Sequence, residues 1–373
     1  MKATHAVINP PRPERAVLVG HGGRNGATLA RSLEELARLT DTAGARVLAT
    51  VTQKRGVIHP ATFIGKGKLE ELNAEVESSD ADMVIFDDDL SPAQMRNLEK
   101  ALGRKVVDRS ELILDIFARR ARTRESRLQV ELAQLEYTFP RLTGMWKHLE
   151  RQAGGIGTRG PGETQLETDR RLVRERIARL KKELEAVERE RETQRRRRRR
   201  EFRAAIVGYT NAGKSTLFNV LTRARVLVED RLFATLDATT RQLVSPTRQV
   251  VLLTDTVGFI RKLPHHLVAS FHSTLVEAIE ADLLLHVVDT SDPHFRRQIA
   301  AVEEVLEEIL ETPRPTTLVF NKTDRIEDPT VVEGLRVEYP GSFAISARAG
   351  EGLDALRDFL WSQAGERSAR RAS

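Results

Sequence analysis

Gly208-Tyr209-Thr210-Asn211-Ala212-Gly213-Lys214-Ser215 is the stretch of this chain that decides its fold. It follows a β-rich run at 204–207 and precedes a helical pattern that begins at Thr216. Glycines at this spacing, followed by Lys and Ser, form a phosphate-binding loop where a strand leads into a helix. Backbone N–H groups and the positive helix end then bind phosphate, Lys214 reaches the β and γ phosphates, and Ser215 ligates Mg²⁺. The whole stretch and Thr216 are therefore predicted to contact a nucleotide.

After this loop, the chain alternates between strand-like and helical patterns. Strand-like runs at 250–254, 283–288, 317–320 and 343–345 are separated by helical patterns. Alternating strands and helices predict a mostly parallel sheet. We expect a P-loop G domain over residues 201–365, and a disordered tail over residues 366–373, where arginines lie among small residues.

Two motifs at strand ends are predicted to select the base. The first, Asn321-Lys322-Thr323-Asp324, follows the run at 317–320. Its Asp324 carboxylate can accept hydrogen bonds from N1–H and the 2-amino group of guanine, whereas adenine has neither donor at these positions. The second, Ser346-Ala347-Arg348, is placed to offer the Ala347 N–H to guanine O6. We therefore expect base contacts from Asn321, Lys322, Asp324, Ser346, Ala347 and Arg348, with GTP as substrate and GDP as product.

Two further loops are predicted to sense the γ phosphate. In Asp255-Thr256-Val257-Gly258, Asp255 can hold Mg²⁺ through water and the Gly258 N–H can bond the γ phosphate. The other loop begins Phe233-Ala234-Thr235-Leu236-Asp237 and holds threonines at 235, 239 and 240, of which Thr235 is favoured as the Mg²⁺ ligand. We expect Lys214, Thr235 and Gly258 to be catalytic, and all residues of both stretches to line the nucleotide site.

Phe259 follows Gly258, where Ras-like enzymes place a glutamine that orients the attacking water. A phenylalanine side chain neither donates nor accepts a hydrogen bond. Hydrolysis by the chain alone should therefore be slow, with a partner, another residue or K⁺ completing the site. The alternative is that Phe259 packs in the core while an unidentified residue orients water.

Residues 1–112 are predicted to form a separate α/β domain. Strand-like runs at 16–19, 46–51, 83–86 and 106–107 alternate with helical runs at 29–39 and 91–102, which again indicates a parallel sheet. Gly22-Gly23 is interpreted as a simple turn, although it could bind a second phosphate ligand.

Residues 113–200 are predicted to form a helical hairpin. Apolar residues recur three, four or seven apart from Leu114 to Phe139 and again from Leu166 to Val187. The glycine-rich segment 144–163 cannot continue either helix, so an antiparallel pair joined by a compliant loop is the simplest arrangement. Two separate helices that belong to different bodies remain the alternative to the hairpin, and a flexible linker remains the alternative for the glycines.

Charge and composition narrow the classes of function. Residues 116–200 contain 24 Lys and Arg against 13 Asp and Glu, while the whole chain carries +6, so the flanking parts are mildly acidic. A local positive field suits a polyanion, and the alternative is a solvated basic face. The absence of cysteine excludes disulfides, thiolate zinc sites and cysteine nucleophiles. With no apolar run long enough for a signal peptide or a membrane span, we expect a soluble, cytoplasmic protein. A monomer is the expected state, although the sequence itself does not determine it.

Together the motifs resemble the HflX GTPases, of the Obg-HflX branch of translation-factor-type G proteins. The resemblance rests on GYTNAGKST, FATLDATTR, DTVGFI and NKTD in the G domain, and more specifically on FIGKGKLEEL at 63–72, ILDIFARRARTRESRLQVELAQLEY at 113–137 and GGIGTRGPGETQLE at 154–167. It implies an α/β domain, a helical hairpin and a G domain that associate with the large (50S) ribosomal subunit. It also implies ribosome-stimulated GTPase activity and the splitting of stalled or idle ribosomes under stress. By the same analogy, Thr235 is the switch threonine on Mg²⁺ and Phe259 fills the glutamine position.

The expected RNA contacts lie at the hairpin loop. Folded RNA presents phosphates, 2′-hydroxyls and shape, which a thin basic projection with a compliant tip can recognise. We expect these contacts from Lys147, His148, Arg151 and Arg159. A different class of function stays open, in which the hairpin is a coiled-coil module of a nucleotide-dependent protein-protein switch.

Overall fold

The chain divides into two compact units, Met1–Ile116 and Phe117–Ser373. The computed structural model describes residues 12–22, 26–54, 56–142, 161–198, 201–224, 229, 231–262, 277–310 and 312–372. Each unit is built around its own β-sheet, which is parallel in the first unit and mostly parallel in the second.

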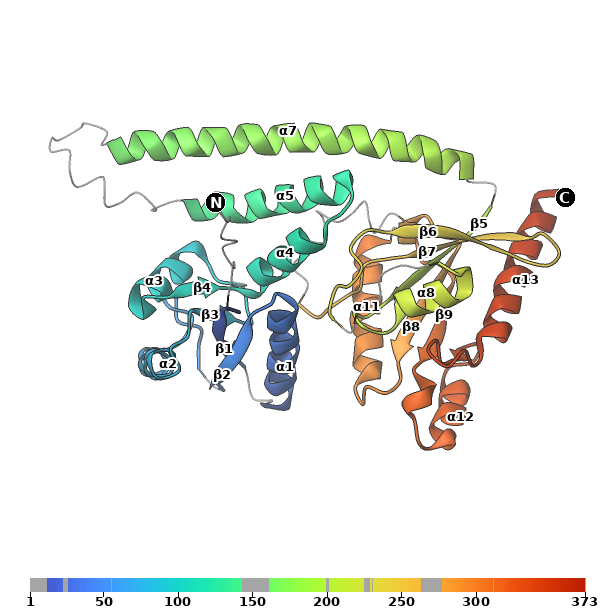
Figure 1. Ribbon diagram of the computed structural model, residues 1–373, viewed down its shortest axis with the longest axis horizontal. Coiled ribbons are helices and arrows are strands. Elements are labelled where there is room, and N and C mark those ends of the chain that lie inside the picture. The colour runs from blue at the N-terminus through green and yellow to red at the C-terminus, as the bar shows by residue number, and fades with distance from the viewer. Residues whose placement is uncertain are drawn as a thin grey trace, which may run out of the picture. The chain divides into compact units, whose positions relative to one another are not determined.

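The first unit is an α/β layer with the parallel strand order β2-β1-β3-β4 (Figure 1). Ser91 caps α3 by accepting from Gln94 N–H, and Pro92 occupies the first turn, which confirms the helix start expected there. The helix α2 was not predicted, because only Leu72 and Val76 are buried on it and its apolar periodicity is weak. The elements are β1 (Arg15–His21), α1 (Gly26–Thr42), β2 (Arg46–Gln53), α2 (Lys66–Ser78), β3 (Met83–Phe86), α3 (Pro92–Leu102), β4 (Lys105–Val107) and α4 (Arg109–Arg120), whose last turn, from Phe117, belongs to the second unit.

A helical hairpin opens the second unit. The helices α5 (Arg124–Thr138) and α7 (Pro161–Arg198) run antiparallel, with the short helix η1 (Phe139–Leu142) after α5 (Figure 1). Their shared seam is apolar, as predicted, and consists of the buried side chains Leu128, Leu132, Leu180 and Leu184. Although α7 is long, its many charged side chains exclude it as a membrane span, and the other described helices likewise lack the length or the apolar character.

The helical run expected from Leu114 to Phe139 is broken at residues 121–123, which corrects the prediction of one continuous helix. Thr123 has extended backbone dihedrals and caps α5, because its hydroxyl accepts a hydrogen bond from Ser126 N–H at 3.1 Å. The apolar spacing continues across the break, so periodicity alone could not reveal it.

The second sheet has the described strand order β10-β9-β8-β5-β7-β6. Neighbouring strands are parallel except β6, which pairs antiparallel with β7. This strand was not predicted, because only Leu243 is buried among its mostly polar residues. The elements are β5 (Phe202–Gly208), α8 (Lys214–Thr222), β6 (Thr239–Val244), β7 (Val250–Asp255), β8 (Leu283–Asp289), α11 (Phe295–Ile309), β9 (Thr316–Asn321), η2 (Thr323–Arg325), α12 (Pro329–Glu338), β10 (Phe343–Ala344) and α13 (Leu353–Ala372).

Helix α13 continues through Ala372, so the prediction of a disordered tail from residue 366 is wrong. Arg367 pairs with Asp282 and donates to the Glu201 carbonyl, while Ser368 Oγ donates to the Ala364 carbonyl at 3.0 Å. These partners lie far away in the sequence or within the helix itself. Arg367 therefore has a structural use that composition does not reveal.

Candidate functional site

The phosphate-binding loop joins β5 to α8, as the sequence predicts. Gly213 has a left-handed φ of 93°, and a Cβ added to it would lie 2.2 Å from Asn321 Nδ2. Only glycine combines this dihedral with such a close approach. The loop is thus shaped both by its own backbone and by the asparagine of the base motif.

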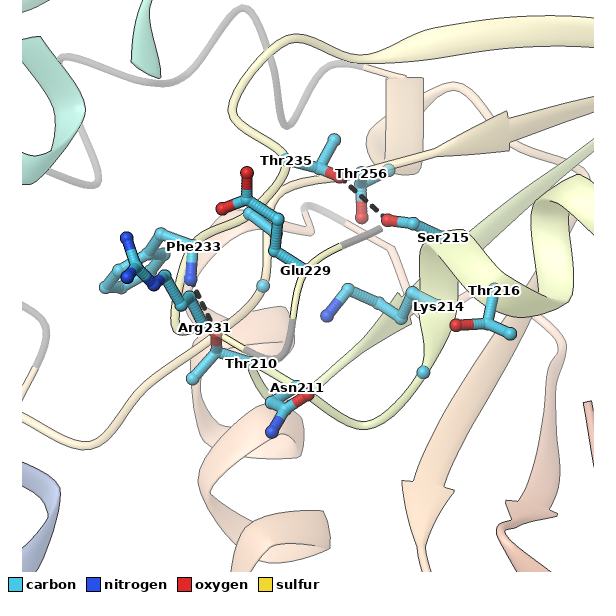
Figure 2. Close-up of a pocket in the computed structure, with 13 residues that line it drawn as sticks. Thr210, Asn211, Lys214, Ser215, Thr216, Glu229, Arg231, Phe233, Thr235 and Thr256 are labelled. Atoms are coloured by element: carbon cyan, nitrogen blue, oxygen red, sulfur yellow. Dashed lines mark hydrogen bonds between the residues drawn. The ribbon is translucent and has the colours of Figure 1, made fainter. Parts of the chain in front are cut away.

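A pocket lies over this loop, with side chains from three segments around it (Figure 2). Eleven predicted nucleotide contacts line it: Thr210, Asn211, Gly213, Lys214, Ser215, Thr216, Phe233, Ala234, Thr235, Thr256 and Gly258. Glu229 and Arg231 also line the pocket, and sequence reasoning missed both. They precede the recognisable threonine motif, and no spacing rule marks them.

Lys214 is buried at the centre of the phosphate site. Its Nζ donates to the carbonyl oxygens of Tyr209 at 2.8 Å and Gly208 at 3.1 Å. Burial lowers the pKa of Lys214 to about 8, partly offset by the charge of Asp255. A phosphate group bound beside this ammonium would favour its charged form.

Three oxygen groups meet next to the lysine, at the place expected for Mg²⁺. Ser215 Oγ lies 2.6 Å from Asp255 Oδ2 and 2.7 Å from Thr235 Oγ1. Burial raises the pKa of Asp255, and its Oδ1 atom has no hydrogen-bond partner in the described part of the chain. Hydroxyl and carboxylate oxygens are ligands that Mg²⁺ accepts, so this donor set fits the ion.

The loop after β7 packs directly on the phosphate loop. Thr210 N–H donates to the Phe259 carbonyl at 2.7 Å, and Phe259 N–H donates to the Gly208 carbonyl at 3.1 Å. The Phe259 side chain is 2% exposed, so it belongs to the core and provides no polar group for water. Thr256 Oγ1 donates to the Ile206 carbonyl, and Val257 is buried.

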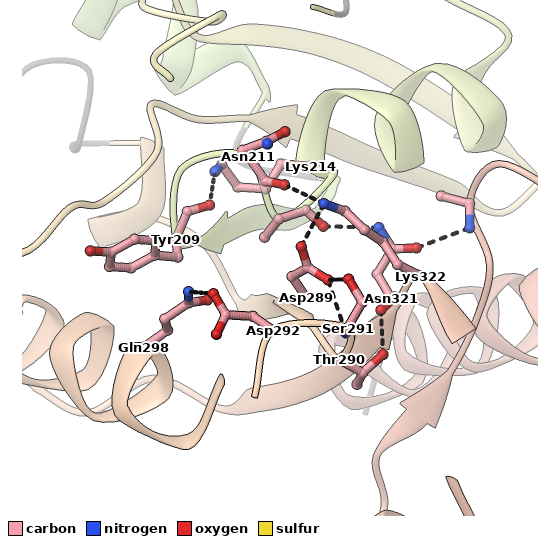
Figure 3. A network of polar contacts seen from close by, with 12 residues as sticks. Tyr209, Asn211, Lys214, Asp289, Thr290, Ser291, Asp292, Gln298, Asn321 and Lys322 are labelled. Carbon is pink, nitrogen blue, oxygen red and sulfur yellow. Dashed lines mark hydrogen bonds and ion pairs between the residues drawn. The ribbon is translucent and has the colours of Figure 1, made fainter. Parts of the chain in front are cut away.

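Asn321 connects the phosphate loop to the base motifs (Figure 3). Its Nδ2 donates to the Ala212 carbonyl at 2.9 Å, and its Oδ1 accepts from Ala347 N–H at 3.0 Å. In this structure the Ala347 N–H that we expected to face guanine O6 is therefore bonded to Asn321. This hydrogen bond holds the second base motif, at Ala347, beside the first, at Asn321.

Lys322 extends the same network on the outer side of the loop. Its backbone is left-handed, with φ of 66°, and its Nζ donates to the Asn211 carbonyl at 2.9 Å and Asp289 Oδ2 at 2.6 Å (Figure 3). Asp289 also accepts from the Ser291 hydroxyl at 2.6 Å. We did not predict Asp289, although its position at the end of β8 was the available signal.

Asp324 is exposed at the end of the same segment, where a base can reach it. Ser346 Oγ donates to Asp324 Oδ1 at 2.6 Å and accepts from Ala349 N–H at 3.0 Å. The serine thus fixes the orientation of the carboxylate. Arg348 is exposed, while Ala347 is buried.

Several predicted contacts do not line the pocket. Tyr209 is buried and its hydroxyl accepts from Arg261 N–H at 2.9 Å, while Leu236 packs in the core. The Asp237 carboxylate accepts hydrogen bonds from the start of α5. Lys147, His148, Arg151 and Arg159, the expected RNA contacts, lie outside the described residues.

A parallel sheet with a phosphate loop, a Mg²⁺-type oxygen set and an asparagine-aspartate base motif at its strand ends defines a P-loop GTPase. Three family models match consecutive regions: a GTP-binding GTPase N-terminal region at 30–118, a GTP-binding GTPase middle region at 120–198 and a 50S ribosome-binding GTPase at 203–322. The chain belongs to the HflX family of GTPases, and it hydrolyses GTP.

The relatives support this assignment over most of the chain. GTPase HflX of Lacrimispora saccharolytica is 52% identical over 349 residues, covering 93% of this chain and 82% of the relative. GTPase HflX of Escherichia coli is 50% identical over 327 residues, covering 87% and 77%. Among solved structures, the SsGBP and GDP complex is similar with 27% identity and a TM-score of 0.52, covering 95% of this chain and 99% of that one.

Proposed function

We propose that this GTPase binds the large (50S) ribosomal subunit and dissociates stalled or idle 70S ribosomes under stress, with GTP hydrolysis resetting its binding. It acts in the cytoplasm, as a monomer. The observation that carries the proposal is the basic hairpin, since 24 Lys and Arg stand against 13 Asp and Glu over residues 116–200. The match of the G domain to a model described as a 50S ribosome-binding GTPase supports the same partner.

The hairpin has the properties that RNA binding requires. Its two helices are held together by an apolar seam and by ion pairs, such as Arg176 with Glu131 at 2.6 Å. Such a stiff pair can carry a loop into a groove of folded RNA, where Lys147, His148, Arg151 and Arg159 would neutralise phosphates. Each neutralised phosphate releases counterions, so binding should weaken steeply with salt.

The nucleotide site divides the chemistry among a few groups. Lys214 binds the β and γ phosphates, Gly258 N–H bonds the γ phosphate, and Asp324 recognises guanine. Ser215 and Thr235 would hold Mg²⁺ directly and Asp255 through water, consistent with the orphaned Oδ1 atom of Asp255. The bound ion would neutralise charge on the β and γ phosphate oxygens.

Water activation needs a group that Phe259 does not provide. Because this side chain is buried, hydrolysis without a partner should be slow, and the ribosome should stimulate it. A K⁺ ion is a second candidate for completing the site. Replacing K⁺ by Na⁺ in the assay separates these two contributions.

Sedimentation with purified 30S, 50S and 70S particles tests the proposal. We expect cosedimentation with 50S in a non-hydrolysable GTP analogue, weaker binding in GDP, and conversion of 70S to subunits. Arg151→Gln with Arg159→Gln should abolish binding, whereas Arg189→Gln, on the exposed face of α7, should leave it unchanged. Absence from the 50S fraction in both nucleotides would remove the ribosomal assignment and leave the GTPase intact.

The protein-protein switch makes a different prediction in the same experiment. Coiled-coil pairing through an apolar seam depends little on salt, whereas RNA binding falls steeply between low and physiological salt. Binding that persists at high salt and ignores the loop arginines would favour the switch.

A further inference from the structure

The loop that carries Thr235 is held at Asp237 by the start of α5. Asp237 Oδ1 accepts from Thr123 Oγ1 at 2.6 Å, and Asp237 Oδ2 accepts from Arg122 N–H at 3.1 Å. The Thr123 hydroxyl also accepts from Ser126 N–H, so one hydroxyl both caps α5 and holds the loop. The carboxylate therefore lies at the N-terminal end of α5.

The same loop is held on the other side of Thr235. Arg120 donates to Glu229 Oε2 at 2.5 Å, and this contact keeps the pKa of Glu229 below its usual value. The rings of Phe117 and Phe233 meet edge to face, with centroids 4.8 Å apart. The segment 117–123 therefore contacts the loop on both sides of Thr235. The contacts before it are at Glu229 and Phe233, and the contact after it is at Asp237.

Thr235 lies between these anchors and faces the pocket. Its hydroxyl is 2.7 Å from Ser215 Oγ, and Figure 2 shows the two joined above Lys214. Asp237 is only two residues away, yet its side chain makes its contacts with α5 and does not line the pocket. A shift of the α5 start would therefore move the loop that positions Thr235.

We propose that Asp237 is a positioning residue for GTP hydrolysis, which holds Thr235 in place through its hydrogen bonds to Thr123 and Arg122. Its side chain does not line the nucleotide pocket. The same hydrogen bond connects the first helix of the hairpin to the nucleotide site, because the Thr123 hydroxyl both caps α5 and binds the loop that carries Thr235. The inference rests on the role proposed above for Thr235.

GTP hydrolysis by the full-length chain without ribosomes tests the inference. A hydrogen bond to a charged group is strong enough for its loss to lower a rate by about tenfold or more. We expect Asp237→Ala and Thr123→Val each to lower kcat and the affinity for a non-hydrolysable GTP analogue by about that factor. Their affinity for GDP should stay within about twofold, because GDP has no γ phosphate to engage this loop.

The controls separate positioning from loss of structure. Thr123→Ser keeps the hydroxyl and should retain the rate, and Asp354→Asn, on the exposed start of α13, should behave as the native chain. In the double variant of Thr123→Val with Asp237→Ala, the loss should not exceed that of Asp237→Ala alone, because the aspartate change already removes the hydrogen bond that Thr123→Val removes. Equal losses for GDP and the GTP analogue, fully additive losses, or unchanged rates would overturn the inference.

Thr235→Ala distinguishes this inference from the function on which it rests. If that variant keeps the native rate, the proposed role of Thr235 fails. If it loses activity while Asp237→Ala and Thr123→Val keep it, only the positioning role fails.

Discussion

A Cβ atom on Gly258 would lie 2.9 Å from the Nζ atom of Lys214. The same atom would approach the Thr210 backbone Cα to 2.7 Å. The loop after β7 thus packs against the phosphate loop at a distance that leaves no room for a side chain. This contact makes the position of one loop depend on the other.

Replacing Gly258 by alanine should therefore act on the γ-phosphate contact. The added methyl group would push the loop away and displace the N–H that we propose bonds the γ phosphate, so we expect kcat to fall by about 10²-fold or more. Affinity for GDP should change little, and rapid-mixing hydrolysis assays with GDP titrations measure both effects.

Gly334→Ala is the matched control for that change. A Cβ at Gly334, on α12, meets nothing within 4 Å, and alanine is the better helix former. This variant should keep the native rate and melt no earlier. A Gly258→Ala enzyme as active as this control would contradict the close packing.

The lowered pKa of Lys214 predicts a proton uptake on nucleotide binding. Its pKa is about 8 in the free protein, and a bound phosphate favours the charged ammonium. Above that pH the neutral amine must gain a proton to bind, so affinity should decline as pH rises from about 7.5 to about 9. Below about pH 7 the lysine is already charged and binding should take up no proton at this group.

Calorimetry in buffers of different ionisation enthalpy measures this uptake. Near pH 8.5 the number of protons taken up should approach the fraction of Lys214 that is neutral. In Lys214→Arg, whose guanidinium stays charged, the proton uptake should vanish. The same uptake at pH 6.5 and pH 8.5 would show that another group titrates.

The part of the fold that sequence could predict is the part fixed by local patterns. The phosphate loop, the strand ends at Asp255 and Asn321, and the hairpin seam each follow from spacing within one segment. Local pattern also predicted the helical run at 91–102, which is α3 with Ser91 as its cap.

What sequence could not predict depends on contacts between distant segments. Thr123 breaks a helical pattern where Asp237, more than a hundred residues away, meets its hydroxyl. Arg367 orders the last helix through Asp282, and Glu229 enters the pocket rim beside Arg120. No local spacing encodes these partners, so they emerge only once the chain is folded.

Guanine recognition by Asp324 is the central claim about the site. In Asp324→Asn, Ser346 still has an oxygen to which it can donate, but the amide nitrogen now faces the 2-amino group of guanine as a second donor. Xanthine carries an oxygen at that position, which can accept from the amide. The substitution should therefore exchange a preference for GTP for a preference for xanthosine triphosphate.

Calorimetric titration of the native chain and of Asp324→Asn with GTP, ATP and xanthosine triphosphate measures this most directly. We expect the native chain to bind GTP at least about 10²-fold more tightly than ATP, and the variant to prefer xanthosine triphosphate to GTP. Asp354→Asn should keep the native order. Equal binding of ATP and GTP by the native chain, or an unchanged GTP preference in Asp324→Asn, would contradict the assignment.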